Sequence, residues 1–195
     1  AARWRAAAPP QFVFCLKAWQ VITHPPTSPT YRRTRLDARD REHCGQFGFN
    51  PTVRWAWEQT FAVAQVLRAA VVVFQCPANF RPTAENVARV RRFFEKAKRG
   101  RFHLGWEPRG EWDPALIAKL CHDLELIHVV DPLVTDAAAT GPIRYYRVQG
   151  AQRRVAKPDW RRLQQACAGR PAAYCFFNTS LRAADARRFK DLISE

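Results

Sequence analysis

Short apolar runs alternate with amphipathic stretches along the whole chain, and this alternation restricts the possible folds more than any other feature. The runs are rich in Val, Ile, Phe and Tyr, as is typical of buried parallel strands. They cover residues 12–19, 70–76, 102–106, 126–130, 143–148 and 172–177. Strands separated by helices predict a parallel α/β fold.

The stretches between the apolar runs carry the signals of helix starts. Apolar residues at helical spacing predict a helix over residues 52–67. Thr83 can cap the next helix, and Asp113 followed by Pro114 is a typical cap and first helical position. Two further helices are expected, from Pro158 to about residue 168 and over residues 185–193.

Two layouts fit six strands of this kind, an open doubly wound sheet and an incomplete barrel. The open sheet normally carries a Gly-rich phosphate loop after its first strand, but residues 20–26 contain no glycine. A complete barrel typically needs ~250 residues, and this chain has 195. We therefore predict a single domain over residues 1–195, an incomplete (β/α)8 TIM-type barrel with about six βα units. Because the chain contains no Met, residue 1 is not expected to be the natural start.

One long polar segment interrupts the pattern. Residues 25–50 are rich in Arg and directly follow the first strand. Long loops of this kind are usually functional lids or disordered segments. In a barrel this segment would lie over the face formed by the C-terminal ends of the strands.

Polar side chains gather at the C-terminal ends of the predicted strands. One parity of each strand is apolar, as a helix-facing side must be, while the other parity turns polar near its end. Barrel enzymes place their chemistry at this end. The candidates for catalysis are Lys17, Glu107, Asp131 and Arg147, and those for substrate binding are His24, Gln75, Arg109, Tyr145, Gln149 and Asn178. Ion pairs that simply fill the barrel, such as Lys17 with Asp131 or Arg147 with Glu107, are the alternative.

The chain resembles the YecE-like family (domain of unknown function 72). The matching stretches are residues 12–24 (FVFCLKAWQVITH), 74–77 (FQCP), 106–110 (WEPRG), 130–132 (VDP), 145–150 (YYRVQG) and 176–178 (FFN). The resemblance implies a TIM barrel whose first two βα units, with a glutamate strand and a Thr-Phe-Tyr segment, are absent here. Residues 1–10 would then be the tail of the second helix.

Two positions depart from the pattern of this family. Relatives usually carry a histidine where this chain has Gln149, and often two asparagines where it has Asn178 and Thr179. If that histidine carries a proton or binds a metal in relatives, this chain has lost it.

The net charge of +15 arises from 32 Lys and Arg against 17 Asp and Glu. Such a surface attracts polyanions, although a GC-rich coding bias also produces Arg-rich chains. The first hypothesis is a nucleic-acid-binding protein, with a nuclease-like phosphoesterase activity left open, because barrels of this type are similar to metal-dependent endonucleases. The others are an enzyme for a small phosphorylated or carboxylated substrate, and a non-catalytic component of a ribonucleoprotein assembly. The basic stretches comprise Arg89, Arg91, Arg92, Lys96, Lys98, Arg99 and Arg101, and Arg153, Arg154, Lys157, Arg161 and Arg162.

A cofactor is not identified by any motif. A divalent metal is conceivable through His24, His103, Glu107 and Asp131, but these residues are scattered and His128 has the helix-facing parity. The six cysteines show no CxxC spacing, which favours buried thiols in a cytoplasmic protein over a disulfide framework. No stretch reaches the ~20 apolar residues that a membrane-spanning helix needs, so no membrane partner is expected.

Overall fold

The computed structural model describes residues 1–34, 36–138, 141–150, 155–169 and 171–194. The chain divides into two compact units, Ala1–Leu126 and Ile127–Glu195. The first unit contains α1 (Ala2–Ala7), β1 (Cys15–Lys17), α3 (Pro51–Leu67), β2 (Val71–Gln75), α4 (Ala84–Lys96), β3 (His103–Glu107) and α5 (Pro114–Asp123). The second contains β4 (Leu126–Val130), whose first residue lies at the boundary, β5 (Ile143–Gly150), α6 (Lys157–Cys167), β6 (Ala172–Thr179) and α7 (Arg182–Ser194).

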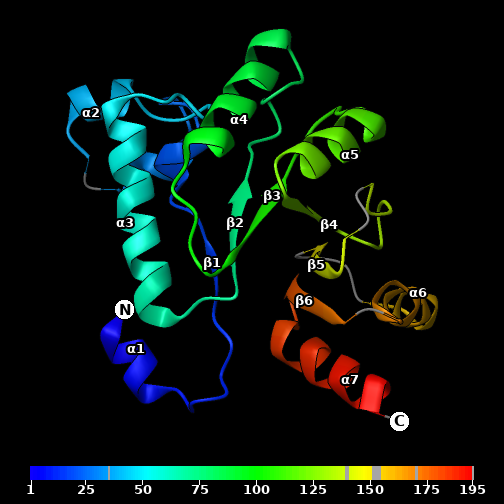
Figure 1. Ribbon diagram of the computed structural model, residues 1–195. Coiled ribbons are helices and arrows are strands. Elements are labelled where there is room, and N and C mark those ends of the chain that lie inside the picture. Colours follow the sequence, from blue (N-terminus) through cyan, green and yellow to red (C-terminus); the bar gives the residue numbers. More distant parts are fainter. Residues whose placement is uncertain (35, 139–140, 151–154, 170, 195) are drawn as a thin grey trace. The chain divides into compact units, whose positions relative to one another are not determined.

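The strands pair in parallel and in chain order within each unit. In the first unit β1 pairs with β2 and β2 with β3. In the second unit β4 pairs with β5 and β5 with β6. Helices connect most of these strands, and α3 runs beside β1 and β2 in Figure 1. The α/β fold with six parallel strands confirms the predicted fold class, an incomplete TIM-type barrel.

Local sequence signals explain where the helices begin. The side chain of Asn50 accepts a hydrogen bond from the Val53 N–H and caps α3. Thr83 and Asp113 cap α4 and α5 in the same way, as predicted. The last helix begins at Arg182, three residues before the predicted start at Asp185. Asp185 instead lies in the first turn, where it is buried and accepts a hydrogen bond from Thr179 Oγ1 at the end of β6.

Each unit has its own apolar core. In the first, Phe47, Phe74, Phe93 and Phe94 are almost fully buried and their rings contact one another. In the second, the buried core is Leu133, Val148, Trp160, Leu163 and Phe189. No disulfide joins the six cysteines, all of which lie in the described part of the chain. In the same part, no helix is long and apolar enough to cross a membrane.

The segment 25–50 contains two short helices, a 3-10 helix over Pro29–Arg33 and α2 (Ala38–Glu42). Three backbone hydrogen bonds join its end to the chain after β1, from Gly45, Gln46 and Phe47 to the carbonyls of residues 21, 23 and 22. Tyr31, Cys44 and Phe47 are buried, so the segment is anchored to the first unit. Arg35 lies outside the described residues.

Candidate functional site

The first group of site residues lies at the C-terminal ends of the strands of the first unit. Lys17, Gln75 and Glu107 are the last residues of β1, β2 and β3. Gln75 and Glu107 are register partners, and both are buried although they are polar. Lys17 is level with Val73, so it lies one side-chain step below Gln75 on the same face of the sheet, and it is exposed.

Glu107 forms an ion pair with Arg109, two residues further along the chain. The Nε and Nη2 atoms of Arg109 both lie 2.9 Å from Glu107 Oε1. The Glu107 side chain is only 5% exposed, whereas that of Arg109 is 33% exposed. The turn that follows depends on Gly110, which has a φ of +92° and whose Cβ, if present, would meet the Ala78 carbonyl oxygen at 2.6 Å. The guanidinium thus covers a buried carboxylate while still reaching solvent.

His24 is the third buried polar residue of this group. Its Nδ1 atom lies 2.7 Å from Thr23 Oγ1, and its carbonyl oxygen accepts a hydrogen bond from the Tyr31 hydroxyl. Burial, and then the positive charges of Lys17 and Arg109, lower the pKa of His24 to about 4. The imidazole is therefore neutral near pH 7 and lies within electrostatic reach of two cations.

Gly45 explains how the segment 25–50 can pass directly against His24. A Cβ at position 45 would lie 2.0 Å from the His24 carbonyl oxygen, and the φ of +87° is one that glycine adopts without strain. Sequence patterns did not identify Gly45, Thr23 or Tyr31 as neighbours of the site. Their signal was weak because none of them lies at a strand end.

This group combines an enclosed carboxylate, a neutral imidazole, an amide and two cations. Such a set can bind an anion through Lys17 and Arg109, whereas a pKa of about 4 makes the imidazole a weak proton acceptor near pH 7. The same residues are less suited to holding a metal ion. No group of three or more His, Cys, Asp and Glu side chains suited to a metal ion occurs among the described residues. His103 begins β3 whereas Glu107 ends it, which separates them by about 13 Å at the rise of a strand.

The second group of site residues belongs to the second unit. Asp131 directly follows β4, and both its carboxylate oxygens accept backbone hydrogen bonds. Its Oδ1 accepts from the Leu133 N–H at 3.0 Å and its Oδ2 from the Gln149 N–H at 2.9 Å. Asp131 therefore ties the end of β4 to β5, in addition to any chemical role.

Aromatic rings line the strand face that bears Arg147, Gln149 and Asn178. Tyr145 stacks on Phe176, with ring centroids 5.0 Å apart and planes inclined by 13°. Arg147 is level with Phe176, and Gln149 with Asn178, in the register of β5 and β6. The opposite face of these strands packs on the core of the unit through Val148, Cys175 and Phe177. Phe176 was not predicted as a site residue, although its parity with Asn178 was the available signal.

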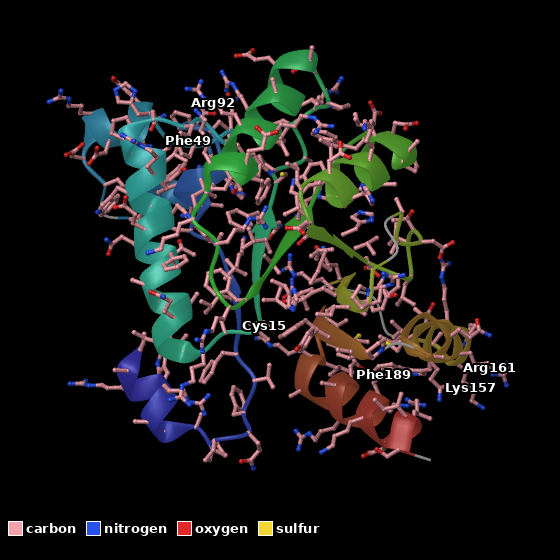
Figure 2. The ribbon with its side chains drawn as sticks, viewed as in Figure 1. Cys15, Phe49, Arg92, Lys157, Arg161 and Phe189 are labelled. Atoms are coloured by element: carbon pink, nitrogen blue, oxygen red, sulfur yellow. The ribbon has the colours of Figure 1, made fainter. Side chains whose placement is uncertain are left out.

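The basic stretch of α4 and its exit is largely engaged in intramolecular contacts. Arg89 pairs with Glu85 at 2.5 Å and Arg91 with Asp123 at 2.8 Å. Arg99 donates to the carbonyl oxygens of Phe94 and Leu124. Lys157 and Arg161 are exposed on α6 (Figure 2). Arg153 and Arg154, which were expected to extend that surface, lie outside the described residues.

Comparisons with known proteins agree with the strand-end motifs. The family model described as "Protein of unknown function DUF72" matches residues 1–195. The chain belongs to the DUF72 family. This confirms the resemblance seen in the sequence.

Two solved DUF72 structures have the same fold. One is a DUF72 family protein from Enterococcus faecalis, with 15% identity, a TM-score of 0.63, and coverage of 100% of this chain and 78% of that one. The other is from Thermotoga maritima, with 16% identity, a TM-score of 0.64, and coverage of 99% and 78%. No curated protein matches the chain. At these identities the likeness is one of fold.

Proposed function

We propose that this protein binds nucleic acid through its phosphate groups, with little dependence on base sequence. The observation that carries the proposal is that two cations within reach of solvent lie at the strand ends of the first unit, Lys17 at the end of β1 and Arg109 just after β3. One phosphate of the backbone would contact these two cations. The net charge of +15 would attract the polyanion from a distance, and other exposed cations of the first unit, such as Arg92, would contact further phosphates.

Binding of this type has a diagnostic dependence on salt. Each phosphate that a cation neutralises releases condensed counterions, so the logarithm of the binding constant falls linearly with the logarithm of salt concentration. Fluorescence anisotropy of a labelled single strand and a labelled duplex, titrated at several salt concentrations between 50 and 200 mM, measures the slope. With a handful of contacts we expect affinity to fall by about 10³-fold or more over that range.

Lys17→Gln tests whether the strand-end site takes part. We expect the variant to bind more weakly and to reduce the salt slope by about one contact. The matched control is Lys119→Gln, which removes the same charge from an exposed position on α5 where Lys119 pairs with Asp123. Affinity that does not change with salt, or an equal loss in both variants, would contradict the proposal.

A nuclease-like phosphoesterase activity is the finer form of the same proposal. The support is that the imidazole of His24 lies within electrostatic reach of the two cations that would hold a phosphate. Incubating the bound oligonucleotide with and without added divalent metal and resolving the products on a gel tests for cleavage. Binding without cleavage would leave only the binding function.

An enzyme for a small phosphorylated or carboxylated substrate is the second candidate. It is favoured by the enclosure of Glu107, which is 5% exposed under the Arg109 guanidinium, because a buried carboxylate suits a small ligand better than a polymer. Thermal shift assays with a panel of phosphorylated and carboxylated metabolites test it. We expect stabilisation by at least one compound and no stabilisation of Lys17→Gln, whereas silence across the panel would exclude the compounds tried.

We also place the protein in the cytoplasm. The support is that its cysteines form no disulfide, as is usual in a reducing compartment.

A further inference from the structure

A basic cavity lies in the first unit at the opposite end of the strands from Glu107. It has a volume of about 710 Å³. Arg68 and Ala69 lead into β2, and Phe102 directly precedes β3, so the cavity opens at the N-terminal ends of these two strands. Its lining includes Phe61, Arg68, Lys98, Arg99, Arg101 and Phe102.

The charged residues that line this cavity are all cations. Arg99 is held by the carbonyl oxygens of Phe94 and Leu124, and the nearby Glu125 interacts with its charge. Lys98 Nζ lies 4.7 Å from the centroid of the Phe61 ring. Among the described residues, neither Arg68 nor Arg101 forms an ion pair, which distinguishes them from Arg89 and Arg91 on α4.

The backbone of Arg68 is unusual for its residue type. Arg68 ends α3 with φ 50° and ψ 49°, in the left-handed region, where glycine is the common residue and a side chain costs about 1–2 kcal/mol. Gln46, Phe47 and Glu125 share this positive φ, and of these four residues Arg68 is the one that lines the cavity. Strained positions of this kind concentrate at ligand sites.

Close packing shapes the apolar wall of the cavity. A Cβ at Gly100 would lie 2.4 Å from the Phe102 ring, so only glycine lets the chain cross the ring between two cationic residues. Phe61 and Phe102 are buried beneath the cations, with ring centroids 5.4 Å apart. The four cations are themselves exposed above this apolar wall, so an anion can reach them from solvent.

We propose that this cavity binds a ligand with two or more adjacent phosphate groups, through Arg68, Lys98, Arg99 and Arg101. The volume exceeds what a single phosphate fills, and guanidinium groups match phosphate oxygens through paired hydrogen bonds. The ligand is either a small polyphosphate or successive phosphodiesters of a nucleic acid. This site is separate from the strand-end site and does not depend on the function proposed for it.

Pyrophosphate is the probe, and isothermal titration calorimetry at low salt is the measurement. We expect one site on the unmodified protein and a loss of about tenfold in affinity for Arg101→Gln, as for one charge-assisted contact. Arg54→Gln is the matched control, because Arg54 is exposed near the start of α3, over the ring of Phe49, whereas the cavity lies at the end of α3. The control should bind within about twofold of the unmodified protein.

Arg68→Gly separates binding from folding. Glycine fits the left-handed conformation, so the variant should melt at the same temperature as the unmodified protein or higher, while binding pyrophosphate several-fold more weakly. An equal loss of affinity in Arg101→Gln and Arg54→Gln would show that only the overall charge attracts the anion and would overturn the proposal. The absence of any binding would do the same, as would loss of the site in Lys17→Gln with Arg101→Gln unaffected.

A short single-stranded oligonucleotide, added as competitor, distinguishes the two sources of phosphate. Displacement of pyrophosphate identifies successive phosphodiesters as ligands of the cavity. Retention of pyrophosphate, with the oligonucleotide bound elsewhere, identifies a small polyphosphate. Both results support the phosphate chemistry, and the Lys17→Gln variant shows separately whether the strand-end site binds nucleic acid.

Discussion

His24 and His128 are two buried histidines that must remain neutral for the fold to be stable. His24 lies in the candidate site of the first unit, whereas His128 lies in β4 of the second unit, where its Nδ1 accepts a hydrogen bond from the Ala138 N–H. Burial is the main cause that lowers both pKa values to about 4, with positive neighbours adding to it, Lys17 and Arg109 for His24 and Arg144 for His128. Protonation would remove the acceptor of His128 and place a third charge beside the two cations around His24.

These pKa values predict a loss of stability in mild acid. In the unfolded chain both histidines titrate near pH 6.5, so between pH 6.5 and 4 the unfolded state binds protons that the folded state does not. The free energy of unfolding therefore falls as the pH falls through this window, by roughly 2 kcal/mol per histidine down to pH 5 and by roughly 3 kcal/mol at most over the whole window. Urea denaturation at pH 7, 6 and 5 measures it.

Substitutions assign the effect to the histidines. His24→Gln and His128→Asn cannot titrate, and each should remove part of the pH dependence while the stability at pH 7 falls only moderately. If the double variant loses stability between pH 7 and 5 as steeply as the unmodified protein, other groups are responsible.

The segment 25–50 has an apolar anchor that the sequence analysis did not predict. Its anchor is Phe47, which is 1% exposed and packs against Phe74, Phe80, Phe93 and Phe94 with ring centroids 5.4–6.3 Å apart. Gln46 and Phe47 both have a φ of +52°, a strained turn that turns the ring into the core. Composition could not reveal this anchor, because the segment around it is polar.

Removing the ring of Phe47 should destabilise the protein far more than removing the ring of its half-buried neighbour Phe49. Phe47→Ala leaves a cavity in a closely packed aromatic cluster, and such changes cost about 3–5 kcal/mol. Phe49→Ala is the matched control, because Phe49 is only half-buried and contacts Phe93 at the edge of the cluster. Chemical denaturation of both variants measures the difference, and equal losses would contradict the role of Phe47 as the anchor.

At the scale of the whole molecule, the fold could be predicted because the periodicity of apolar residues in the sequence determines the strands and helices. Alternating side chains define the buried and open faces of each strand, and caps such as Thr83 and Asp113 mark helix starts without knowledge of distant contacts. The hydrogen-bond and ion-pair partners of the site residues could not be predicted, because such contacts depend on side-chain positions to within tenths of an ångström. Glu107 pairs with Arg109 rather than standing alone, and both oxygens of Asp131 accept backbone N–H groups. Neither fact follows from the position of a residue at a strand end.

The rate at which a thiol reagent modifies Cys44 can report the opening motions of the segment 25–50. Cys44 lies in the segment 25–50, is 5% exposed, and donates a hydrogen bond to the Asp40 carbonyl oxygen, while burial raises the pKa of its thiol. Cys76 and Cys121 lie in the core of the same unit. A thiol reagent reaches Cys44 when the segment detaches, and the other two when the unit opens further. The ratio of the modification rate of Cys44 to those of Cys76 and Cys121 therefore reports how independently the segment moves from the rest of the unit. All three thiols are natural residues of the chain.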